Sequence, residues 1–157
     1  MKTERLIDFI LEANKVGYAA EGGVYKVKES DGSTSITYEC GPWRFHDNYF
    51  GGEPFGGRTV ISLEGKPAWF MAYWGGVSET VTDIERVYRF LQAALKRMPR
   101  ARPFRGPSVY REGSLTYHND CSSSDVEKFS GDELIKEGKR TIYRAVYFGG
   151  LVDQRPE

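Results

Sequence analysis

The pentapeptide YWGGV at residues 73–77 recurs almost unchanged as YFGGL at residues 147–151. Eighteen positions before the tyrosine of each copy, a Phe-x-Gly triplet occurs, FGG at 55–57 and FSG at 129–131. Two motifs that recur in the same order and at the same spacing are typical of an internal duplication. This duplication determines how the rest of the chain is divided. The sequence therefore predicts two copies of one unit, each of about 75 residues.

The two copies are predicted to be residues 1–77 and 78–152 of a single domain that spans residues 1–157. Each copy begins with an amphipathic helix and continues as an antiparallel meander of strands, so the predicted fold class is α+β. Two such units are expected to join with pseudo-twofold symmetry, and a binding groove is then expected at their junction. The alternative is that glycine and aromatic residues simply recur, as they do in many β-rich chains.

Helical periodicity predicts two helices. The first runs from about Thr3 to Lys15, and the second begins at a capping box formed by Thr82 and Glu85 and ends before Pro99. Runs of β-branched and aromatic residues predict the strands, and the glycine pairs at 51–52 and 56–57 are interpreted as turns between them. The predicted strands are 24–29, 35–40, 43–49, 59–63, 68–74, 108–111, 115–118, 126–129 and 140–148.

The composition excludes several classes of protein. Of the 157 residues, 22 are Lys or Arg and 22 are Asp or Glu, so no net field draws the chain to a nucleic acid or to an anionic membrane. No apolar run approaches the roughly 20 residues of a spanning helix, and the N-terminus lacks the pattern of a secretion signal. We therefore expect a soluble cytoplasmic protein in which Cys40 and Cys121 are free thiols.

Aromatic residues are dense around the glycine-rich middle of the chain. Because side chains alternate along a strand, Trp69 and Tyr73 are expected on one face of their strand, and Phe70 and Trp74 on the other. One face should be core, and the other is either core as well or an exposed aromatic surface that suits a planar ligand or a partner.

A set of motifs extends over nearly the whole chain, at residues 46–52, 55–57, 65–73, 105–107, 115–118, 129–133 and 147–150. These motifs resemble a bacterial family of uncharacterised domains, DUF5680. In some members the domain follows a helix-turn-helix segment, so the resemblance implies a sensing or regulatory role, without catalytic residues. The sequence departs from the family pattern at Ala72, where a polar Asn is expected, and its first copy has Thr59 where the second has Glu133.

Three carboxylates lie in or beside the aromatic region, at Glu39, Asp47 and Glu53. A carboxylate held against apolar rings tends to have a raised pKa and can act as a general acid or bind a cation or an amine. The simpler interpretation is a solvated or turn-capping carboxylate. Asp47 is favoured among the three because it lies inside the motif shared with the family.

These patterns lead to a non-enzymatic domain that binds or senses a small molecule, and no catalytic residue, metal or cofactor is assigned. One alternative is a protein-interaction module that uses exposed aromatic residues, and another is a hydrolase that uses Asp47 or His118. Exposed strand edges also leave a homodimer open. The candidate ligand-binding residues are Tyr38, Asp47, Tyr49, Trp69, Tyr73 and Trp74.

Two cysteines and two histidines form the one set with the chemistry of a zinc site. Their spacing lacks a Cys-x2-Cys pair, which favours buried cysteines and hydrogen-bonded histidines over zinc. These residues are Cys40, His46, His118 and Cys121.

Five basic residues fall within ten positions near the second helix, without an acidic residue among them. Such a cluster can contact phosphates or an acidic partner. We interpret it as a solvated connector, because cations at the C-terminus of a helix are favourable for the helix dipole. The cluster consists of Lys96, Arg97, Arg100, Arg102 and Arg105.

Overall fold

The computed structural model describes residues 3–19, 26–123 and 125–155. This part of the chain forms one nine-stranded antiparallel sheet and two helices, so the α+β prediction is confirmed. Neither helix is long and apolar enough to cross a membrane. The helices are α1 (Thr3–Ala19) and α2 (Ile84–Leu95); the strands are β1 (Val27–Lys28), β2 (Thr34–Cys40), β3 (Trp43–Phe50), β4 (Phe55–Leu63), β5 (Lys66–Val77), β6 (Val109–Glu112), β7 (Leu115–Cys121), β8 (Lys128–Glu137) and β9 (Arg140–Leu151).

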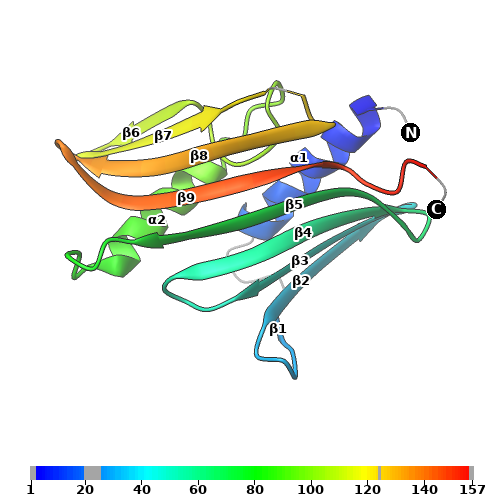
Figure 1. The fold of residues 1–157 in the computed structure, drawn as a ribbon, viewed down its shortest axis with the longest axis horizontal. Helices are drawn as coiled ribbons and strands as arrows, with labels where there is room; N and C mark the ends of the chain where they lie inside the picture. The colour runs from blue at the N-terminus through cyan, green and yellow to red at the C-terminus, as the bar shows by residue number, and fades with distance from the viewer. Residues whose placement is uncertain (1–2, 20–25, 124, 156–157) are drawn as a thin grey trace.

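The sheet is built from two meanders that meet in its middle. The strand order is β1-β2-β3-β4-β5-β9-β8-β7-β6, so the last strand of the first meander pairs with the last strand of the second. This central pair runs antiparallel, and Tyr73 of β5 lies directly opposite Tyr147 of β9. Both helices cover the same face of the sheet (Figure 1), which we call the inner face.

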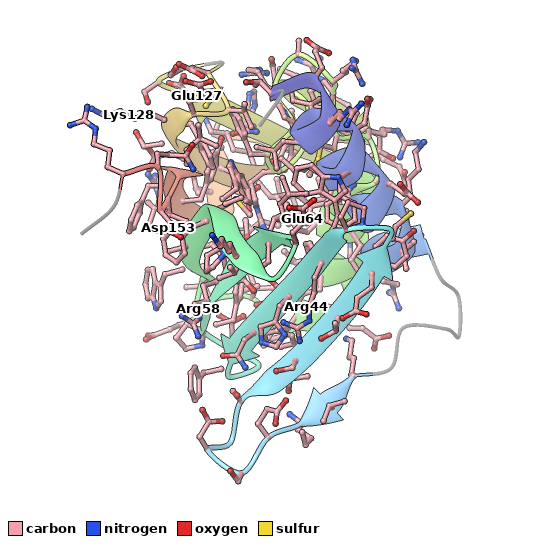
Figure 2. The ribbon with its side chains drawn as sticks, turned by 90° about the vertical axis from the view of Figure 1, so that its right-hand side faces the viewer. Arg44, Arg58, Glu64, Glu127, Lys128 and Asp153 are labelled. Atoms are coloured by element: carbon pink, nitrogen blue, oxygen red, sulfur yellow. The ribbon has the colours of Figure 1, made fainter. Side chains whose placement is uncertain are left out.

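The core lies between the helices and the inner face and consists of two hydrophobic clusters. Under α2, the cluster is built on Val87, Leu91, Tyr117, Ile135 and Tyr143. Under α1, it is built on Leu6, Phe9, Ile61, Trp69 and Phe129. Figure 2 views the molecule from the end where Glu64 and Asp153 lie, with α1 against one side of the sheet.

The main differences from the predicted elements concern glycine. Residues 56–57 lie inside β4, not in a turn, because the strand must pass close beneath its neighbours. A Cβ on Gly57 would lie 2.7 Å from the hydroxyl of Tyr73, and one on Gly75 would collide with Ala145 of β9. These positions need glycine for space, which a sequence pattern does not distinguish from a need for a turn.

Three boundaries also differ from the prediction. The N-cap of α2 is Asp83, whose carboxylate accepts from the backbone N–H of Arg86, so the box predicted from Thr82 is wrong by one residue. Strand β8 extends to Glu137, because its second half alternates buried and partly buried side chains and includes charged residues. The strand predicted at 24–29 forms over Val27–Lys28, and its residues 24 and 25 lie outside the described part of the chain.

Candidate functional site

A cavity of about 590 Å³ lies between the first meander and the helices. Its floor is the inner face of β2 to β5, and its other walls are α1, α2 and the segment that follows α2. Both predicted copies therefore contribute walls, whereas β6 to β9 contribute none of the described lining residues. The cavity thus lies over the first meander, and β5 is the strand of the central pair that borders it.

Four of the six predicted ligand-binding residues line this cavity. Asp47 and Tyr49 reach it from β3, and Trp69 and Tyr73 reach it from β5. Trp69 is also part of the core, since its Nε1–H donates to the carbonyl of Val126 at 3.0 Å. The alternation expected along β5 is responsible for the placement of Trp69 and Tyr73 on the inner face.

The other two predicted residues lie outside the cavity lining. Trp74 points from β5 to the outer face, where its side chain is 59% exposed, because it follows the inward Tyr73 by one residue. Tyr38 lies under α1, where its ring stacks on Phe9 and its hydroxyl donates to Glu12 at 2.5 Å. This hydrogen bond raises the pKa of Tyr38 to about 12. Tyr38 thus helps to attach α1 to the sheet.

Asp47 is the central polar group of the cavity. Its carboxylate accepts from Thr59 Oγ1 at 2.8 Å and from the Tyr73 hydroxyl at 2.9 and 3.0 Å. Burial raises the pKa of Asp47 above its ordinary value, although the two hydroxyl donors and the charge of Arg105 act in the opposite direction. The site therefore holds a carboxylate in a position where its charge is costly unless a further partner stabilises it.

Asn14 of α1 supplies a second acceptor, which the sequence pattern did not indicate. The residue is 7% exposed and lines the cavity, and its Nδ2 donates to the carbonyl of Leu95 at 3.2 Å. Because a carbonyl can only accept, this contact fixes the orientation of the amide. Its Oδ1 is buried without a hydrogen-bond partner among the described residues, and such an atom calls for an explanation.

Arg105 forms the base of the cavity and was misassigned to the solvated connector. It is 5% exposed, and its Nε and Nη2 both donate to Glu133, which is 0% exposed. Tyr117 and Tyr143 donate to the same carboxylate at 2.7 and 2.9 Å, and burial raises the pKa of both hydroxyls well above the ordinary value. The one backbone signal here is the positive φ of 66° at Arg105, which only the structure reveals.

The remaining arginines of the connector also contact the protein itself. Arg97 lies over the ring of Tyr110 at 4.4 Å, Arg100 pairs with Glu4 and Asp8, and Arg102 donates to Ser108. The segment is therefore attached to α1 and to the second meander. Arg97 and Arg100 are nevertheless exposed, as the prediction of a solvated connector requires, and the prediction is wrong for the buried Arg105.

The central strand pair carries two matching contacts. On the β5 side, Tyr73 donates to Asp47, and on the β9 side, Tyr147 donates to Asn119 Oδ1 at 2.7 Å. A Cβ added at Gly131 would meet the hydroxyl of Tyr147, as one at Gly57 would meet that of Tyr73. The two sites differ in that the Asn119 site is buried and the Asp47 site borders the cavity.

The other groups considered for chemistry lie apart from the cavity or from each other. Glu39 pairs with Arg44 at an exposed site, and Glu53 accepts from the backbone of Val77 and from Tyr88. The predicted cysteine and histidine set does not converge, and no group of three or more His, Cys, Asp or Glu that could hold a metal ion occurs in residues 3–19, 26–123 and 125–155. Cys40 is exposed, Cys121 donates to Ser123, and His46 contacts Thr37.

Comparisons with known proteins give one finding. Neither the comparison with curated proteins nor that with solved structures gave a match. Residues 47–152 match a family model described as Domain of unknown function (DUF5680), which begins at the cavity carboxylate and ends after the central strand β9. This match extends over well more than half of the chain, which therefore belongs to the DUF5680 family.

Proposed function

We propose that this domain binds a small organic molecule in the cavity between its first meander and its helices. The observation that carries the proposal is the cavity itself, which has the size and the mostly apolar, aromatic lining that ligand pockets share. Its few polar groups, led by Asp47, suit the fixing of one orientation of a bound molecule.

The contrast between the two meanders supports the proposal. Beneath α2, the second meander is filled by Tyr117, Ile135 and Tyr143, each at most 1% exposed. Protein interiors are normally packed to this density, and a hollow of several hundred cubic ångströms loses many packing contacts. The hollow in the first meander is thus a feature that a purely structural domain has no reason to keep.

Binding can be tested with N-phenyl-1-naphthylamine, an apolar probe whose fluorescence rises when it leaves water. We expect saturable binding to the wild-type protein and about tenfold weaker binding to Ala13→Phe, because Ala13 lines the cavity and the larger ring would occupy its volume. Ala13→Leu should give an intermediate loss, which keeps the test open if the phenylalanine variant folds poorly. Ala101→Phe, at an exposed alanine, is the matched control. Equal binding by all four proteins contradicts the proposal.

We also propose that the domain arose by duplication of a helix-and-meander unit. The proposal is supported by the strand order, by the pairing of Tyr73 with Tyr147, and by the two matching tyrosine contacts on either side of that pair. An experimental structure in which residues 1–77 and 78–152 fail to superpose strand for strand would count against it.

A second candidate function is association through the outer face of the sheet, with a second copy of the chain as the partner. Trp74, Val146 and Phe148 are 59%, 45% and 58% exposed there, and Trp74 lies opposite Val146 on the central pair. Exposed apolar clusters of this kind often mark interfaces. Sedimentation velocity should then show a dimer that Phe148→Ser dissociates, and a monomer at all concentrations contradicts this candidate.

We place either function in the cytoplasm. The support is the balanced charge of the chain and the two cysteines, which are both free thiols in the structure.

A further inference from the structure

Two hydrogen-bond acceptors face the cavity, one from the sheet and one from the helix that covers it. Asp47 on β3 presents a carboxylate, and Asn14 on α1 presents a buried carbonyl oxygen that has no donor among the described residues. Both acceptors belong to residues that line the same cavity. An acceptor buried without a donor is costly, so the missing hydrogen is expected to come from whatever occupies the space.

Several donors that line the cavity are directed at acceptors of the protein. The amide nitrogen of Asn14 donates one hydrogen bond to a carbonyl of α2, and the side chains of Tyr88 and Arg105 donate to glutamates. These internal contacts join Asn14 to Leu95, Tyr88 to Glu53, and Arg105 to Glu133. Among the described residues, the Asp47 carboxylate and the Asn14 side-chain carbonyl oxygen are acceptors that a bound molecule can reach.

The contacts of Asp47 itself favour a cation as its further partner. The hydrogen bonds to Asp47 come from the neutral hydroxyls of Thr59 and Tyr73, whereas Arg105 donates both Nε and Nη2 hydrogens to the buried Glu133. A carboxylate that is largely removed from water gains most from a charged donor. Lys26 and Arg105 also line the cavity, and Arg105 is paired with Glu133, so the preference for a cation is local to Asp47 and Asn14.

Aromatic rings surround this carboxylate on the floor of the cavity. Phe45 and Tyr49 lie two residues before and after Asp47 on the same face of β3, and Trp69 lines the cavity from β5. The faces of such rings attract organic cations, and a carboxylate with several rings is a recurrent way to bind a substituted ammonium group. The same rings offer a flat apolar surface to the body of the molecule.

On these grounds, and resting on the proposed function, we infer that the ligand is an organic amine with an aromatic or aliphatic body. Its ammonium group donates to the carboxylate of Asp47 and to the carbonyl oxygen of Asn14, and its body lies against the rings of the cavity floor.

The variant that tests this inference is Asp47→Asn, which removes the charge and keeps the shape. The fold itself indicates that an amide fits this arrangement, because Asn119 accepts from Tyr147 in the matching contact on the other side of the central pair. Asp132→Asn is the matched control, since Asp132 is an exposed carboxylate on a strand that does not line the cavity.

The experiment compares tryptamine, tryptophol and indole-3-acetate as competitors of N-phenyl-1-naphthylamine, because the three share an indole body and differ in the charge of the side chain. We expect tryptamine to bind about tenfold more tightly than the other two. Asp47→Asn should abolish this preference and leave the binding of tryptophol unchanged, whereas Asp132→Asn should keep it. Asn14→Leu, which removes the second acceptor, should weaken tryptamine more than tryptophol.

The outcomes separate this inference from the proposed function. If the fluorescent probe binds in the cavity and tryptamine competes no better than tryptophol or indole-3-acetate, the inference is overturned and the binding function stands. A preference for tryptamine that survives Asp47→Asn overturns it as well. If the fluorescent probe does not bind, or binds equally to Ala13→Phe, both the function and this inference fail.

Discussion

Replacing Arg105 with methionine should destabilise the protein more than any exchange of an exposed arginine. The Arg105 and Glu133 side chains are 6% and 0% exposed, so the substitution leaves a fully buried carboxylate with two tyrosine donors and no cation. Removal of one partner from a buried ion pair typically costs about 3–5 kcal/mol. Since domains of this size unfold with about 5–15 kcal/mol, the variant should lose a large part of its stability.

The assay is urea denaturation followed by tryptophan fluorescence, with Arg100→Met as the matched control. Arg100 also makes two charged contacts, with Glu4 and Asp8, but its side chain is 52% exposed, and water can replace those contacts. We expect a much lower urea midpoint for Arg105→Met and no measurable shift for Arg100→Met. Equal midpoints for the two variants would refute the reasoning that burial sets the energy of the Arg105 contact.

Three further predictions concern the sheet and the cavity carboxylate. Because the pKa of Asp47 is raised, this carboxyl keeps its proton in the native state at pH values where the unfolded chain has released it. The contribution of Asp47 to the free energy of unfolding should therefore fall as the pH rises from the ordinary pKa of 3.8 through the pKa of the native state. Urea midpoints should show that fall for the wild type relative to Asp47→Asn, and a constant difference would contradict it. Gly57→Ala should cost about 1–3 kcal/mol, since its Cβ would lie 2.5 Å from the carbonyl of Asn48, whereas Gly52→Ala, with open space around its Cβ, should have little effect on the urea midpoint. Trp69→Ala should cost about 3–5 kcal/mol and Trp74→Ala less than about 0.5 kcal/mol by the same measurement, and similar losses would contradict their placement on opposite faces.

The sequence was sufficient for the helices, most strands and the grouping of the β5 side chains into two faces, but not for which face borders the cavity. Those features depend on local periodicity, which a single chain displays directly. The glycines at 56 and 57 were misread because their roles depend on neighbouring strands. A Cβ at Gly56 would meet the side chain of Trp74, and one at Gly57 would meet the hydroxyl of Tyr73. The C-terminal part of β8 was not predicted for a related reason. Its charged Glu133 is an inward residue of the strand because Arg105 reaches it from a distant segment.

The candidate site was predictable only where it follows the strands. Asp47, Tyr49, Trp69 and Tyr73 lie on inward positions of β3 and β5, and strand alternation places them together once the two strands share a sheet. Asn14 belongs to the site through the packing of α1 across that sheet, and no local pattern in its helix distinguishes it from any other polar residue.

The continuous ladder between β5 and β9 has a consequence for how a molecule enters the cavity. Nine residues of β5, from Trp69 to Val77, pair with β9, so the sheet has no hinge between its halves. Helix α1, in contrast, is attached to the rest of the fold by side chains, such as the contacts of Glu12 with Tyr38 and of Asp8 with Arg100. Any widening of the cavity that a bound molecule needs should therefore come from a displacement of this helix, while the paired strands beneath it keep their arrangement.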